Sequence, residues 1–246
     1  MKSFPTDFFP LEYYGYNLTN GARQGLISPL RGYEAVIERI FQVLLRQTPK
    51  RYNPLLLDLD ESRQWQVINE VVRRMALGEA PDPLPTRQVI ALNYETLLAT
   101  DSLVNHSFEK AQRSLWYDQQ REETELSEND RLDKMFQWPT LEDWSAPTVV
   151  LARLQALFLA VRQTHGQVLL CLPHFDRLLG RESGEEKQQH QIDAYSLLKP
   201  TLARREIQLM GTCAPAQYRQ YIERNAAIAC RLQEICLRSD EELQRI

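Results

Sequence analysis

Apolar residues along the chain form short runs that alternate with a helical pattern. Leu55, Leu56 and Leu57 follow an Asn-Pro pair, and apolar residues recur at helical spacing over residues 67–75. This arrangement predicts a strand, a turn and an amphipathic helix in that order. Residues 168–172 and 207–211 are two further apolar runs of strand length.

Composition limits the class of protein. The 246 residues are 43% hydrophobic and 25% charged, which is enough to bury a substantial core in one domain. The net charge of −4 argues against nucleic acid or an anionic membrane surface as a partner. The first ten residues lack the continuous apolar core of a signal peptide, and no 18-residue apolar stretch occurs. We therefore expect no membrane insertion and a cytoplasmic, stromal or matrix location.

Several segments, in the right order, resemble the first ATPase domain of the ClpB/ClpC-type unfoldases, a branch of the AAA+ proteins. They are residues 22–25 with Pro29 and Gly32, 37–44, 53–81, 197–204 and 217–227. The resemblance implies an α/β fold, namely a P-loop NTPase-like AAA+ large subdomain with a parallel sheet flanked by helices. The family's small helical lid domain would begin where this sequence stops, so we expect it to be absent.

The phosphate-binding loop of the family would fall on residues 58–65. In this overlay the family's glycines correspond to Asp58, Glu61 and Arg63, the lysine to Gln64, and the magnesium-holding hydroxyl residue to Trp65. Glycines let backbone N–H groups approach phosphates, and the lysine supplies positive charge. Carboxylates at positions 58, 60 and 61 would instead satisfy the free N–H groups of the helix and repel a triphosphate. We expect a degenerate, self-capped loop.

The resemblance also implies that the magnesium and water-activating positions are lost. They fall on Pro173 and His174, after the apolar run at 168–172. Proline has no side chain that can ligate a metal, and a histidine base has no polarised phosphate to work on. The sensor position falls on residues 212–214, after the run at 207–211. We therefore expect a pseudo-ATPase that is not an enzyme, with no catalytic residue, no cofactor and no metal.

Two side-chain questions stay open from the sequence. The family's paired arginines fall on Cys230 and Arg231, and Arg231 either contacts a partner's carboxylate or is an ordinary solvated residue. Cys171 and Cys213 would lie on neighbouring strands. They are either buried, reduced thiols, a redox pair, or, with His174, the reactive groups of some new chemistry.

Aromatic side chains in two segments are the candidate partner-binding residues. Residues 114–147 form an insertion in which aromatic and acidic residues alternate. Residues 1–24 form an aromatic arm that prolines 5 and 10 predict to be extended. Each segment either docks on a partner or folds back on its own domain. The candidates in these segments are Trp116, Tyr117, Phe136, Trp138, Trp144, Phe8 and Phe9.

The leading hypothesis combines these points. Residues 25–246 would form a degenerate AAA+ large subdomain that acts as a non-catalytic adaptor or assembly subunit. Its partner would be a Clp-type AAA+ ring, which it could regulate or join, or another multi-subunit complex, and self-association is open. The alternative is a sensor domain that binds a nucleotide or another small ligand without hydrolysis. Arg63 is the one basic residue in the loop that could support that alternative.

Overall fold

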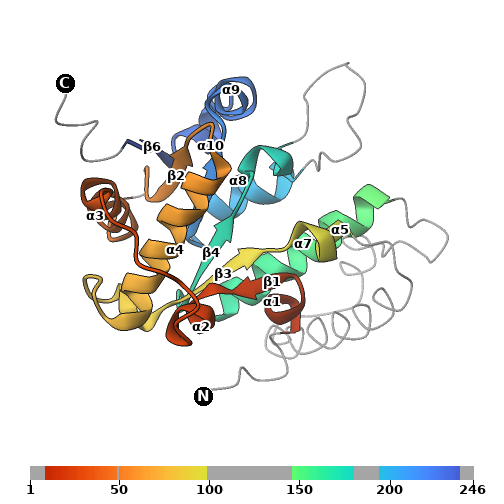
Figure 1. The fold of residues 1–246 in the computed structure, drawn as a ribbon. Coiled ribbons are helices and arrows are strands. Elements are labelled where there is room, and N and C mark those ends of the chain that lie inside the picture. Colours follow the sequence, from red (N-terminus) through yellow and green to blue (C-terminus); the bar gives the residue numbers. More distant parts are fainter. Residues whose placement is uncertain (1–8, 49, 99–145, 180–193, 239–246) are drawn as a thin grey trace.

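The computed structural model describes residues 9–48, 50–98, 146–179 and 194–238, with the side chains of 9, 10 and 146–149 excepted. Within these residues a single sheet has the order β1-β3-β4-β5-β2-β6 (Figure 1). Its first strand pairs antiparallel with β3, and all other neighbours are parallel. The strands are β1 (Gly15–Asn17), β2 (Asn53–Leu57), β3 (Gln88–Leu92), β4 (Val168–Leu172), β5 (Leu209–Cys213) and β6 (Leu232–Cys236).

Helices cover both faces of this sheet, so the described part of the chain has three layers. None of these helices is both long and apolar enough to cross a membrane. The longer helices are α3 (Glu34–Leu44), α4 (Glu61–Leu77), α7 (Ala146–Gln163) and α8 (Tyr195–Ala203). The shorter ones are α1 (Phe9–Tyr13), α2 (Leu18–Arg23), η2 (Leu84–Thr86), α5 (Tyr94–Leu98), η3 (Phe175–Leu178), α9 (Pro215–Gln217), η4 (Tyr218–Ile222) and α10 (Ala226–Ala229).

The central strands are apolar at every position because both of their faces are buried. Successive side chains point to opposite faces of a strand. Leu55 and Leu57 of β2 accordingly join a core with α7 and α8, whereas Leu56 joins a second core with α3 and α4. Burial on two faces accounts for runs that show no polar alternation. The α/β class with a mainly parallel sheet between helices, expected from the sequence, is confirmed.

Two details differ from the expectations. In the expected extended arm, residues 9–24 contain α1, β1 and α2, and Tyr14 is fully buried against the core. Pro10 is compatible with this helix because it lies in the first turn, where its missing N–H costs no helical hydrogen bond. Strand β5 begins at Leu209, two residues later than predicted, so that Thr212 and Cys213 belong to the strand and Ala214 follows it.

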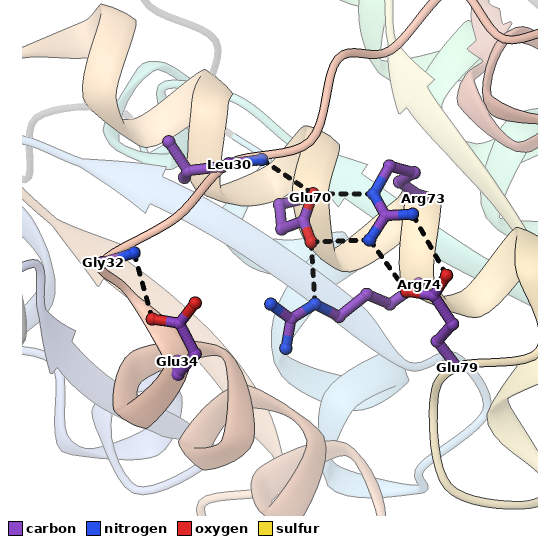
Figure 2. Close-up of polar contacts among 7 residues, drawn as sticks. All are labelled: Leu30, Gly32, Glu34, Glu70, Arg73, Arg74 and Glu79. Atoms are coloured by element: carbon purple, nitrogen blue, oxygen red, sulfur yellow. Dashed lines mark hydrogen bonds and ion pairs between the residues drawn. The ribbon is translucent and has the colours of Figure 1, made fainter.

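The buried carboxylate of Glu70 joins α4 to the segment that precedes α3 (Figure 2). Its Oε2 accepts the Leu30 N–H at 3.1 Å and Arg73 Nε at 2.8 Å. Its Oε1 accepts Arg73 Nη2 at 2.9 Å and Arg74 Nε at 2.7 Å. Burial alone would raise the pKa of Glu70, but these hydrogen bonds outweigh burial and lower the pKa from 4.5 to about 2. The ionised carboxylate therefore stabilises the fold.

Replacing this carboxylate with an amide should destabilise the protein. Glu70→Gln keeps the shape of the side chain but replaces the buried carboxylate that Arg73 and Arg74 share with an uncharged amide, and we expect a loss of about 3 kcal/mol in unfolding free energy at pH 7. Urea unfolding followed by circular dichroism measures this loss. Glu79→Gln is the matched control, because Glu79 also pairs with Arg73 but its side chain is 48% exposed. Equal losses in the two variants would contradict a special role for Glu70.

The same interaction predicts a pH dependence. Because folding lowers the pKa of Glu70, its contribution is complete above its unfolded pKa of about 4.5 and is lost as pH falls through about 2. The difference in unfolding free energy between the natural protein and Glu70→Gln should shrink to roughly half its pH 7 value by pH 3. Urea titrations of both proteins at pH 7, 5, 4 and 3 test this. A difference that stays constant over that range would contradict the assignment.

Candidate functional site

Side chains of the loop itself satisfy the N–H groups between β2 and α4. Asp60 is the N-cap of α4, and its Oδ1 accepts the N–H groups of Ser62 at 2.9 Å and Arg63 at 3.4 Å. Asp58, which directly follows β2, accepts the Asp60 N–H on its Oδ1 at 2.8 Å. Such N–H groups at a helix N-terminus are the ones that bind phosphate in other proteins. Here two carboxylates bind them.

Arg63 and Gln64 are held by the same loop. Arg63 Nη1 lies 3.1 Å from Asp58 Oδ2, and this carboxylate raises the pKa of Arg63 above its usual value. Gln64 is 3% exposed, and its Nε2 donates to the carbonyl oxygens of Asp58 and Cys213, both at 3.0 Å. These two hydrogen bonds use both N–H donors of the amide. Gln64 thereby ties the loop to the end of β5.

The positions expected for magnesium and water activation lie at the same edge of the sheet. Pro173 is buried directly after β4, and His174 adopts a left-handed conformation with φ 48°. The His174 N–H donates to Thr212 Oγ1 at 3.0 Å, and its carbonyl oxygen accepts the Tyr94 hydroxyl at 3.2 Å. His174 Nε2 lies 3.6 Å from Glu61 Oε2. The structure therefore brings the two expected segments, 58–65 and 173–174, into contact.

An acidic side chain that the sequence analysis did not consider also lies at this edge. Asp176 Oδ1 accepts a hydrogen bond from Cys213 Sγ at 3.5 Å. Burial and this carboxylate raise the pKa of the Cys213 thiol, and burial raises the pKa of Cys171 to about 12. Both thiols are free and protonated near neutral pH, whereas nucleophilic attack needs a thiolate. Asp176 follows His174 by two residues. Its position shortly after the end of β4 could have indicated from the sequence that it lies at this edge.

Trp65 and Arg231 do not join the other candidate residues at this edge. Trp65 is partly buried and packs against the core formed with α3 and α4. Arg231 precedes β6, and its carbonyl oxygen accepts the Asn53 N–H at 3.3 Å. Because Asn53 begins β2 and pairs with Leu232, Arg231 lies at the amino edge of the sheet, opposite the loop at 58–65.

The aromatic partner candidates lie outside the described part of the protein. For Phe9, which begins α1, this holds for the side chain. The candidates concerned are Trp116, Tyr117, Phe136, Trp138, Trp144, Phe8 and Phe9.

The candidate site is therefore the carboxyl edge of the sheet, which is where parallel α/β folds bind their ligands. It combines the loop after β2, the turn after β4 and the end of β5. The three segments are cross-linked by hydrogen bonds from Gln64 and His174. In this conformation the loop binds its own carboxylates and presents Asp58, Asp60 and Glu61 at the helix start.

Comparison with known proteins gives a consistent relationship. No family model matches the chain. It is 28% identical over 225 residues to chaperone protein ClpB 2 of Thermosynechococcus vestitus, covering 92% of this chain and 20% of that protein. It is 27% identical to a probable ATP-dependent Clp protease ATP-binding subunit of Chlamydia pneumoniae, covering 92% and 21%. It is 25% identical to the mitochondrial chaperone protein ClpB3 of Oryza sativa subsp. japonica, covering 92% and 18%.

The chain is thus similar to a Clp-type AAA+ ATPase region over nearly all of its length, and its fold is consistent with a P-loop NTPase AAA+ domain. It spans about a fifth of the length of these curated relatives. The similarity corrects one expectation. We expected that the chain is not an enzyme, but the relatives include an ATP-dependent Clp protease subunit and chaperones of the ClpB type, so that expectation is wrong. The residues missing from the expected nucleotide site were not sufficient to infer that the protein is not an enzyme.

Removing the cap of α4 should cost stability in proportion to the lost hydrogen bonds. Asp60→Ala leaves the N–H groups of Ser62 and Arg63 without their acceptor, and we expect unfolding free energy to fall by about 1 kcal/mol. Asp60→Ser is the matched variant, because a serine oxygen can also cap a helix, and it should retain most of the stability. Urea unfolding measures both. Equal losses for alanine and serine would show that capping is not the relevant interaction.

Proposed function

We propose that this chain is an adaptor or assembly subunit that associates with a Clp-type AAA+ ring, and that its loop at 58–65 is degenerate and closed by its own side chains. The observation that carries the proposal is the Asp60 carboxylate on the N–H groups of Ser62 and Arg63. A bound phosphate would need these same donors. The loop therefore supports a structural use of the site more than a ligand-binding one.

The charges around the loop support the same proposal. A triphosphate would have to displace Asp60 and Asp58 and then lie beside their carboxylates, and like charges at short distance repel strongly. Arg63, the cation of the loop, is paired with Asp58 at 3.1 Å. Gln64 occupies the position of the family's lysine, but both of its amide N–H groups donate to carbonyl oxygens. Asp58, Arg63 and Gln64 therefore help to close the loop at positions where the family has its phosphate-binding residues.

The choice of partner rests on the relatives. Their printed names describe Clp chaperones and a Clp protease subunit, and the similarity covers 92% of this chain. A domain of similar fold can associate with such proteins through surfaces that correspond to those of the relatives. We propose that residues 25–246 form the AAA+ large subdomain, joined by β1 and α2, which pair with β3 and pack on its core. The start of the N-terminal arm with Phe8 and Phe9, the segment 114–147 and Arg231 are the parts that we propose for partner contacts.

Association with a Clp ring is testable directly. The purified chain is mixed with the Clp-type ATPase of the same organism, and the mixture is analysed by sedimentation velocity. We expect the chain to sediment with the ring, and Arg231→Ala to weaken this by about tenfold if its guanidinium contacts a partner carboxylate. Arg224→Ala is the control, because Arg224 is an exposed arginine of the same C-terminal part, whereas Arg231 is partly buried. A second comparison deletes residues 114–147.

Calorimetric titration of the isolated chain with ATP tests the alternative, a sensor domain that binds a nucleotide without hydrolysis. We expect no micromolar binding, because the donors of the loop are already occupied. If the chain instead binds ATP at micromolar concentration, loses this binding in Gln64→Ala and does not join the ring, the adaptor proposal is wrong. The nucleotide sensor would then be the better account.

A further inference from the structure

A cleft lies at the edge of the sheet opposite the loop at 58–65. It has a volume of about 490 Å³, and its walls include residues that precede β2, β3, β4 and β5. Because these strands run parallel, their amino ends lie at one edge, whereas Asp58 and Pro173 follow the carboxyl ends. The last turn of α7 and the segment that follows α8 complete the cleft. It is therefore separate from the candidate site described above.

The cleft has an excess of positive charge. Arg87, Arg162 and Arg205 line it, against the single carboxylate of Glu206. Arg162 Nη1 lies 3.7 Å from Glu206 Oε1, and this oxygen is also 3.5 Å from Arg204. Among the residues that the structure describes, no carboxylate pairs with Arg87 or Arg205. At least two guanidinium charges are therefore left uncompensated in this cleft.

Neutral groups hold the two uncompensated guanidiniums in position. Arg87 donates through Nη1 to the side-chain carbonyl oxygen of Gln208, and its partial burial lowers its pKa. Arg205 lies over the Tyr52 ring at 4.9 Å from the centroid, and it donates to the carbonyl oxygens of Gln47 at 2.6 Å through Nη1 and of Arg46 at 3.2 Å through Nη2. An uncharged partner fixes an arginine without cancelling its charge. The remaining N–H donors of each fork then suit an anion, since an arginine has five.

We propose that this cleft binds a small molecule with at least two negative charges, carried by phosphate or carboxylate groups. Guanidinium forks bind such groups bidentately. The volume falls in the range of about 300–1,000 Å³ typical of small-ligand pockets. The C-terminal ends of α7 and α8 oppose an anion, but such an end contributes only about half an elementary charge. Two uncompensated guanidiniums exceed that opposition.

Binding is tested by calorimetric titration of the full chain with pyrophosphate and, separately, with citrate, at fixed ionic strength in chloride. We expect at least one of the two to bind. Arg87→Gln and Arg162→Gln should each weaken that binding by about fivefold or more, because each removes a charge from the cleft. Arg224→Gln, which removes an exposed arginine from another part of the protein, should leave it unchanged. Arg162 is 46% exposed, so its variant tests the proposal even if Arg87→Gln fails to fold.

The two titrants distinguish the sources of the charge. Binding of pyrophosphate alone would indicate a phosphorylated ligand, and binding of citrate alone a polycarboxylate. Either result supports the proposal if the cleft variants weaken it. Absence of binding by both at concentrations up to about 10 mM, or equal affinity in the natural protein and both cleft variants, would overturn it. Neither result depends on whether the chain joins a Clp ring, so this inference stands or fails separately.

Discussion

The N–H groups at the start of α4 need acceptors, and this requirement shapes the whole carboxyl edge of the sheet. A 17-residue helix that follows a buried strand points several N–H groups at one place, where either an anion or the protein must satisfy them. Asp60 and Asp58 do so here. Once the loop is closed in this way, Gln64 can reach the carbonyl oxygen of Cys213 and join β2 to β5 through side chains as well as through the sheet. Capping, loop shape and the charge of the site thus have one cause.

Helix α4 is also held by the protein's own groups beyond its N-terminus. Glu70, in its middle, accepts the Leu30 N–H and pairs with Arg73 and Arg74, which ties the segment around Leu30 to the helix. Gly78 ends the helix in the left-handed conformation at φ 79°, where a side chain would be strained. A carboxylate cap, a buried ion pair and a glycine stop therefore fix three points of one element. The N-terminus of this helix is therefore ordered by side chains of the protein itself.

The sequence allowed prediction of the features that depend on neighbouring residues. The strands at 55–57 and 168–172 and the helix after the first of them are local patterns. Acceptors at positions 58 and 60 could be foreseen because they precede a helix by a few residues. The contact between Gln64 and Cys213 spans 149 residues and could not be foreseen, because it depends on how β2 and β5 lie in the sheet. The contact between Glu70 and the Leu30 N–H could not be foreseen for the same reason, because it spans 40 residues, whereas the pairs of Glu70 with Arg73 and Arg74 are local. The step from missing loop residues to the absence of an enzyme failed because it used one site to judge a whole protein.

The two edges of the sheet have opposite electrostatic character, although the chain as a whole has a net charge of −4. The carboxyl edge has Asp58, Asp60 and Glu61 near one helix start, and the amino edge has arginines around a cleft. Five-residue strands separate the edges by about 17 Å, which is about twice the screening length of roughly 8 Å at physiological salt. Direct electrostatic interaction between the edges is therefore weak. An anion at the amino edge would influence the loop at 58–65 only through packing along β2 and β5, so the chemistry of each edge can be assigned from its own residues.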